Sequence, residues 1–272
     1  MFVRSVNRRR PVRGLLLTVL IAAGLASAVP CWGQTVRARA APDGATLLLE
    51  DGREVRLVGL LVPPAGMRFP NPAAERIGQR AAAALAALAV GKPLEIDLGS
   101  RTADRYGRLP AEVRDAAGRL LQAILLAQGL ARFDPGLSPP KESGAMYTAE
   151  RTARDHHRGL WADRAFAVRR PGDLQRSIDD FTIVSGVVAR VERAGARTLI
   201  RFGEDPRRDA TLTIDGAARA RFRALGYDLP ALVGMRIRAR GWVERQGPPV
   251  GGLAIAIEQP VQIERLLGTG EL

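Results

Sequence analysis

Short runs of alternating hydrophobic and polar residues fill the chain from Val36 onward. The alternation turns at Pro42-Asp43-Gly44 and continues from Thr46 to Leu49. Asp51-Gly52 then separates this run from the next one, Glu54 to Leu61. An Asp-Gly pair between two short apolar runs is typical of a β-hairpin. Three strands are therefore predicted at the start of the folded chain.

A helical pattern follows, and two more strands follow the helix. Residues 73–90 are rich in alanine and carry apolar residues at helical spacing. The pattern stops at Gly91-Lys92-Pro93, where glycine and proline favour a helix end. Residues 94–98 and 109–114 then alternate like strands. Three strands, a helix and two strands is the order of the five-stranded OB-fold barrel.

Further helices are predicted at residues 120–131 and 147–161, and a linker at residues 164–180. The linker is polar, shows little periodicity and contains Arg169-Arg170-Pro171-Gly172. Such composition is typical of a connection between domains. The pattern thus places the end of the first domain at about residue 163.

Beyond the linker, the same order of elements recurs. The alternation predicts three strands, a helix and two strands, at residues 182–192, 198–202, 210–214, 217–225, 235–244 and 253–257. We therefore predict a mainly β fold with helices, an α+β chain. An OB-fold barrel at residues 36–163 is followed by a second small OB-like barrel at residues 181–267.

The N-terminus has the features of an export signal. Five arginines within the first 13 residues precede an apolar run from Leu15 to Val29. This run is shorter than the roughly 20 residues that a membrane-spanning helix needs. Ala26-Ser27-Ala28 fits a signal-peptidase site. We expect residues 1–28 to be a signal peptide and the mature protein to be periplasmic or secreted, with no stable membrane span. An uncleaved N-terminal membrane anchor is the alternative.

Composition and charge narrow the chemistry. The 272 residues include 46% hydrophobic ones, which excludes a wholly disordered chain. The formal charge of +13 falls to +8 without the five N-terminal arginines, and this charge permits, but does not require, binding to a polyanion. Cys31 is the single cysteine, so no intramolecular disulfide is possible. With two histidines besides, the chain lacks the usual zinc-ligand set.

Four motifs of the first predicted barrel resemble the staphylococcal nuclease (thermonuclease) family in order and approximate spacing. They are Pro42-Asp43-Gly44-Ala45-Thr46, Val55-Arg56-Leu57-Val58-Gly59-Leu60, Asp104-Arg105-Tyr106-Gly107-Arg108 and Gly159-Leu160-Trp161. The Asp-Arg-Tyr-Gly-Arg motif is the most specific, and the resemblance covers about residues 36–163. Arg240-Gly241-Trp242 resembles part of a C-terminal extension found on some exported bacterial members.

The resemblance implies calcium-dependent hydrolysis of phosphodiester bonds in DNA or RNA. By motif matching, Arg56 and Arg108 stand at the two positions that stabilise charge on the phosphate, a role that suits guanidinium groups. Arg105 stands where the family has a basic residue near a terminal phosphate. Tyr106 stands where the family's ring contacts the nucleotide. Arg105 and Tyr106 are therefore the expected substrate-binding residues.

The acids of the family do not carry over. Two positions that ligate calcium in the family are Ala45 and Leu61, and the position of the water-activating glutamate is Pro64. Alanine and leucine side chains cannot ligate calcium, and proline cannot accept a proton. Asp43 remains as a single acid that could support a metal indirectly. No metal site and no cofactor are therefore expected, unless acids elsewhere replace the lost ligands.

The sequence leaves three functions open. The first is an exported protein that binds single-stranded nucleic acid or another phosphate polyanion through Arg56 and Arg108, with weak or no hydrolysis. The second is an active calcium-dependent endonuclease with relocated acids, for which Glu75, Glu50 and Asp51 are the candidates. The third is an envelope module that binds a protein partner. Whether the chain is an enzyme is thus undecided by the sequence.

Overall fold

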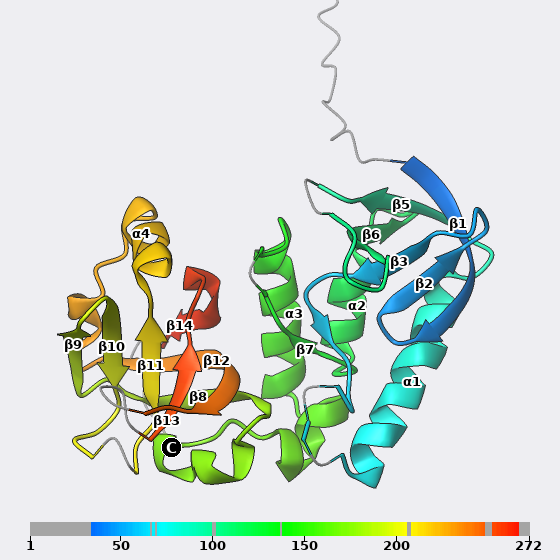
Figure 1. Cartoon of the computed structure of the whole chain (residues 1–272). Helices are drawn as coiled ribbons and strands as arrows, with labels where there is room; N and C mark the ends of the chain where they lie inside the picture. Colours follow the sequence, from blue (N-terminus) through cyan, green and yellow to red (C-terminus); the bar gives the residue numbers. More distant parts are fainter. Residues whose placement is uncertain are drawn as a thin grey trace, which may run out of the picture. The chain divides into compact units, whose positions relative to one another are not determined.

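The structure is a computed structural model, shown in Figure 1. It describes residues 34–65, 67–68, 70–99, 102–136, 138–205, 208–247 and 252–266. The expected signal peptide, residues 1–28, lies outside the described residues. Within the described part of the chain, no helix is long and apolar enough to cross a membrane.

The first half of the described chain is a closed five-stranded barrel. Its strands are β1 (Gln34–Asp43), β2 (Thr46–Leu49), β3 (Glu54–Leu57), β5 (Pro93–Asp97) and β6 (Leu109–Asp115). They follow the order β1-β2-β3-β6-β5, and β5 pairs with β1 to close the barrel. Only β3 and β6 run parallel among these pairs. This confirms the mixed α+β fold with a five-stranded barrel predicted from the alternation.

The expected strand at residues 54–61 is two strands in the structure. Gly59 has a φ of 77°, a conformation that favours glycine, and the turn there ends β3. The next two residues form β4 (Leu60–Leu61), which pairs with β7 (Arg132–Phe133) outside the barrel. The chain therefore leaves the barrel at this turn, shortly after Arg56.

Helix α1 (Pro72–Ala89) follows β4 and covers one side of the barrel (Figure 1). The side chain of Asn71 accepts a hydrogen bond from the amide of Ala74, at 2.9 Å, which satisfies a free donor at the helix start. The helix packs closely against the β1–β2 turn. A Cβ added at Gly44 would lie 2.4 Å from the Cβ of Ala81, so only glycine fits there. The helix and the turn that carries Asp43 are thereby held together.

The two remaining helices of the first half are shorter than the sequence suggests. Helix α2 (Leu121–Ala127) lies within the expected 120–131, and α3 (Ser143–Asp155) ends before the expected Trp161. His157 takes a positive φ of 51°, and the chain turns so that the amide of Leu160 donates to the carbonyl of Gly129 at 2.8 Å. Trp161 then lies buried in a short 3₁₀ turn. Local hydrophobic spacing could not reveal this long-range bond.

The second half of the chain contains a seven-stranded sheet with one helix. Its strands are β8 (Phe181–Val187), β9 (Arg190–Ala194), β10 (Arg197–Arg201), β11 (Thr211–Ile214), β12 (Arg236–Arg245), β13 (Leu253–Ala256) and β14 (Ile263–Arg265), with α4 (Gly216–Ala224) between β11 and β12. The order is β14-β12-β13-β11-β10-β9, and β8 pairs with β12.

This sheet repeats the pairing of the first barrel. Only two residues separate β8 from β9, and both strands together occupy the place that β1 has in the barrel. The parallel pair of β11 with β13 corresponds to that of β3 with β6. Two features differ from the sequence prediction: the first strand breaks after Val187, and β14 is an additional strand beside β12.

Residues 164–180, which the sequence suggested as a linker, form two short 3₁₀ helices at Arg164–Phe166 and Pro171–Ser177. They contact the second sheet directly. The amide of Arg169 donates to the carbonyl of Ile183 at 2.8 Å, and Ile178 forms a β-bridge with Val243. Phe166 also packs in a buried cluster with Ile77 and Trp161 of the first half, so this segment contacts both halves of the chain.

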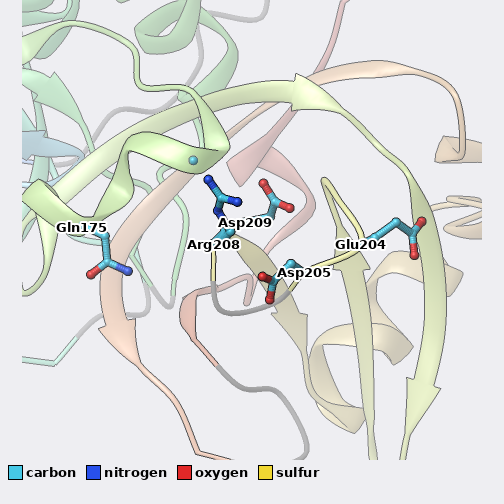
Figure 2. A pocket seen from close by; sticks show the side chains of 6 residues that line it. Gln175, Glu204, Asp205, Arg208 and Asp209 are labelled. Carbon is cyan, nitrogen blue, oxygen red and sulfur yellow. The ribbon is translucent and has the colours of Figure 1, made fainter.

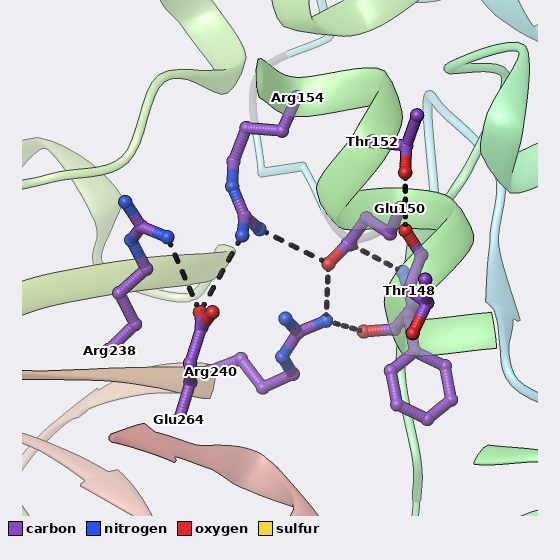
Figure 3. Close-up of polar contacts among 8 residues, drawn as sticks. Thr148, Glu150, Thr152, Arg154, Arg238, Arg240 and Glu264 are labelled. Carbon is purple, nitrogen blue, oxygen red and sulfur yellow. Dashed lines mark hydrogen bonds and ion pairs between the residues drawn. The ribbon is translucent and has the colours of Figure 1, made fainter. Parts of the chain in front are cut away.

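A buried ion pair joins the two halves (Figure 3). Arg240 of β12 lies 2.7 Å from the carboxylate of Glu150 in α3, and their side chains are 2% and 0% exposed. Arg240 also donates to the carbonyl of Phe133 at 3.0 Å, and Glu150 accepts from the amide of Phe133 at 2.8 Å. A charge this deeply buried is tolerated only when it is paired and hydrogen-bonded.

Further charges extend the ion pair into a network. Arg154 of α3 lies 3.4 Å from Glu150 and 3.5 Å from Glu264 of β14, and Arg238 of β12 lies 3.4 Å from Glu264. Figure 3 shows these side chains converging from α3 on one side and from the second sheet on the other. The network explains why β14, which periodicity did not indicate, has a defined place.

We predict that Glu150→Ala strongly destabilises the protein, because it leaves Arg240 buried without its counterion. The free energy of unfolding should fall by about 3–5 kcal/mol, measured by urea denaturation. Glu204→Ala is the control, since the Glu204 side chain is 80% exposed in its pair with Arg190. Its effect should stay within about 0.5 kcal/mol. Equal effects of the two variants would contradict a structural role for the network.

Candidate nucleic-acid interface

Arg56 is held on the barrel by the turn that joins β1 to β2. Asp43 ends β1, and its carboxylate accepts hydrogen bonds from the amide of Ala45 at 2.7 Å and from the hydroxyl of Thr46 at 3.0 Å. Arg56, in β3, sits opposite Thr46 in the strand register. Its Nη1 lies 3.5 Å from Asp43 and 3.3 Å from the Thr46 hydroxyl. The aspartate of the Asp-Gly turn thus orients the first arginine.

Arg108 is held in the same way by the turn before β6. Asp104 accepts hydrogen bonds from the amides of Tyr106 and Arg108, at 2.9 and 3.0 Å, and from Nε of Arg108 at 2.8 Å. The Tyr106 ring is 65% exposed, so it does not pack in the core. The guanidinium carbons of Arg105 and Arg108 lie 4.8 and 5.0 Å from the ring centroid. The turn therefore gathers two cations around an exposed aromatic ring.

The structure brings the two predicted phosphate-binding arginines into electrostatic contact. Burial lowers the pKa of Arg56, Asp43 counters this, and the positive charge of Arg108 lowers the pKa further. Burial alone would raise the pKa of Asp104, but the hydrogen bonds from Arg108 and Tyr106 outweigh it and lower the pKa below its ordinary value. Each arginine is therefore within electrostatic range of the other and paired with its own aspartate.

Two clefts meet at Arg56. The first, which we call the helix-side cleft, encloses about 430 Å³ and is lined by residues that include Asp43, Arg56, Pro64, Glu75 and Gln79. The second, the loop-side cleft, encloses about 800 Å³ and is lined by residues that include Arg56, Asp104, Asp134, Pro139 and Lys141. A phosphate bound at Arg56 would thus have open space on both sides.

Of the three positions where the family has acids, one lines the helix-side cleft and two are buried. Ala45 is fully buried, Leu61 is buried in β4, and Pro64 lines the cleft. Glu75, in the first turn of α1, does line the cleft together with Asp43. Glu50 and Asp51 follow β2 at the other end of the hairpin, and neither is among the described residues that line the two clefts.

The helix-side cleft does not fit a calcium ion. Calcium takes about six to eight oxygen ligands, whereas the carboxylates that line this cleft are those of Asp43 and Glu75. The Asp43 oxygens already accept bonds from Ala45 and Thr46 and face Arg56. Among all described residues, no group of three or more His, Cys, Asp and Glu side chains is arranged to hold a metal ion.

A third hollow, of about 600 Å³, lies in the second half of the chain (Figure 2). Its lining includes Glu204, Asp205 and Asp209 beside one arginine, Arg208. Three carboxylates against one guanidinium repel a phosphate group. This hollow is therefore a weaker candidate for a polyanion than the clefts at Arg56.

Sequence reasoning missed Asp134, which lines the loop-side cleft. Burial raises the pKa of its carboxyl group, and the bond from Gly136 and the charges of Arg240 and Arg132 only partly offset this. No motif marks this position, and Asp134 directly follows β7, which the alternation did not predict. A perturbed carboxyl group in a cleft is a recognised sign of a functional residue.

Arg56 and Arg108, each paired with its own aspartate, thus stand on a closed five-stranded barrel, and Arg56 lines two open clefts. Residues 54–163 match the family model described as staphylococcal nuclease homologue. This match confirms, for residues 54–163, the resemblance drawn from the motifs, and it indicates a function related to nucleic acid. The matched segment includes both Arg56 and Arg108. No curated protein shows a significant match to the chain.

We predict that the pKa of Asp104 lies below 3.8, its ordinary value, in a carboxyl NMR titration. Arg108→Ala should raise this pKa only part of the way, because the amide bonds remain. A depressed folded-state pKa means that ionised Asp104 stabilises the fold above about pH 4 and that this contribution is lost as the pH falls through the folded-state pKa. A wild-type value at or above the ordinary one would contradict the turn geometry.

Proposed function

We propose that this protein is exported and binds single-stranded nucleic acid, or another phosphate polyanion, through Arg56 and Arg108, with weak or no hydrolysis. The observation that carries the proposal is that Arg56 lines two open clefts while the positive charge of Arg108 is near enough to lower the pKa of Arg56. Guanidinium groups bind phosphate through two parallel hydrogen bonds. The leader in the sequence supports export to the periplasm or the medium.

The hydrogen bonds of the arginines support phosphate binding. Arg108 donates to Asp104 through Nε. Among the described residues, no acceptor engages its terminal nitrogens, so these can donate to a phosphate. Arg56 lies 3.5 Å from Asp43, a long contact that a phosphate oxygen can compete with. The aspartates orient both side chains, so a phosphate would meet two guanidinium groups that are already held in place.

The exposed Tyr106 ring supports single-stranded nucleic acid over other polyanions. Aromatic side chains in basic grooves stack on unpaired bases, whatever the base. Tyr106 stands beside Arg105 and Arg108, so one turn offers both a stacking surface and positive charge. A base that stacks there would place its phosphate near the arginine pair.

The weak hydrolysis follows from the residues at the acid positions. Pro64 cannot act as a general base, and loss of a general base costs about 10² to 10⁴ in rate. Ala45 and Leu61 offer no oxygen to a cation. We infer that the phosphate-binding half of the site is retained and the water-activating half is lost.

The binding proposal predicts that Arg56→Ala combined with Arg108→Ala weakens binding to single-stranded DNA about 10- to 100-fold, because two charged contacts are removed. Fluorescence anisotropy over a series of salt concentrations measures this. The slope of log affinity against log salt should become shallower by about 1.4, the value for two phosphate contacts on a single strand.

The matched control is Arg197→Ala combined with Arg223→Ala, which removes the same charge from exposed positions of the second half. It should lower the affinity much less than the site variant. Binding that does not depend on salt, or an equal loss in both double variants, would refute the proposal.

The active nuclease is the second candidate, because Glu75 lines the same cleft as Asp43 and Arg56. We predict that the mature protein with excess calcium leaves plasmid DNA and RNA intact, since the cleft lacks a calcium ligand set. The assay is digestion followed by gel electrophoresis. Cleavage that is abolished by chelator, by Arg108→Ala and by Glu75→Gln would instead establish a working nuclease with a relocated acid.

A further inference from the structure

We infer that Asp134 makes the loop-side cleft prefer nucleobases that carry an exocyclic amino group, such as cytosine, over uracil. The inference rests on the proposed function, since it assigns a role to the cleft next to the phosphate-binding arginines. It concerns a residue of this chain that the family motifs do not include.

The Asp134 carboxylate is fixed in orientation. The backbone amide of Asp134 donates to the carbonyl of Gly59, three residues after Arg56, at 3.2 Å, and the amide of Gly136 donates to Oδ1 of Asp134 at 3.0 Å. Within the described part of the chain, no further hydrogen bond engages Oδ2. One carboxylate oxygen is thus anchored while the other stays open to a donor, and the side chain lines the cleft.

The charges around the cleft leave Asp134 without a direct counterion. Asp104 pairs with Arg108, and the cleft residue Lys141 pairs with Asp97 at 2.6 Å. For Asp134, no ion pair within 4 Å occurs among the described residues. A partly buried carboxylate that lacks a direct counterion is stabilised by a hydrogen-bond donor that enters the cleft.

The two arginines that act electrostatically on Asp134 form their hydrogen bonds with other groups. Arg240 donates to Phe133 and pairs with Glu150, and Arg132 donates to the carbonyl of Phe181. They attract Asp134 through space, yet burial still raises its pKa. The carboxylate is therefore a poorly solvated acceptor in a cleft that Arg56 also lines.

The opposite charges of Asp134 and Arg56 act differently on the phosphate and on the base of a nucleotide. The phosphate is repelled by Asp134 and attracted by Arg56, so a bound nucleotide places its phosphate at Arg56 and leaves the base to contact Asp134. A cleft of about 800 Å³ has room for a nucleoside. Cytosine presents its N4 amino group as a donor to a carboxylate, whereas uracil presents the O4 carbonyl oxygen, which repels a carboxylate.

The test compares oligo(dC) with oligo(dU), each about eight nucleotides long, at mildly alkaline pH to keep cytosine unprotonated. Affinities are measured by fluorescence anisotropy for the wild type, Asp134→Asn and Asp173→Asn. Asparagine can still accept the Gly136 bond, so the turn is kept. Asp173 is exposed and removes an equal charge, which controls for general attraction to the polyanion.

The wild type and Asp173→Asn should bind oligo(dC) about tenfold more tightly than oligo(dU). Asp134→Asn should abolish or reverse the preference, because its amide group can donate to O4. Equal wild-type affinities, or a preference that survives Asp134→Asn, would overturn the inference while leaving phosphate binding intact. No binding of either oligonucleotide would overturn the proposed function and the inference together.

Discussion

The guanidinium groups of Arg56 and Arg108 repel each other electrostatically, and the candidate site depends on how this repulsion is balanced. Burial lowers the pKa of Arg56 most, and the positive charge of Arg108 lowers it further. Asp43 and Asp104 offset the repulsion, one for each arginine. Each aspartate also accepts hydrogen bonds from backbone amides of its own turn. The same carboxylate therefore stabilises the turn and orients the arginine. The site is therefore arranged before any ligand binds.

The second half of the chain is fastened to the first by buried charge. The pair of Arg240 with Glu150 ties β12 to α3, and Glu150 also holds the amide of Phe133. Asp134, the next residue, lines the loop-side cleft. The contacts that attach the second sheet therefore hold Phe133, which is bonded directly to a residue that lines the candidate site. These contacts favour a role for the second sheet in positioning this wall of the cleft over a role as a separate binding surface.

Alternation and turn chemistry were sufficient to predict most strands, because the barrel strands bury alternate residues and Asp-Gly marks the hairpin. They failed where distant contacts decide the structure. Gly59 breaks a strand, β7 and β14 are short and pair with remote strands, and α3 ends early as Leu160 bonds Gly129. Arg56 and Arg108 were found through motifs. Asp134 was not, since its significance comes from burial in a cleft that no local pattern reveals.

The most direct test of the central claim is a crystal structure of the protein with a short single-stranded oligonucleotide, grown with calcium. The account predicts a phosphate group within hydrogen-bonding distance of both the Arg56 and Arg108 guanidinium groups, and no calcium ion in the helix-side cleft. An oligonucleotide bound away from both arginines, or a calcium ion held jointly by Asp43 and Glu75, would contradict it.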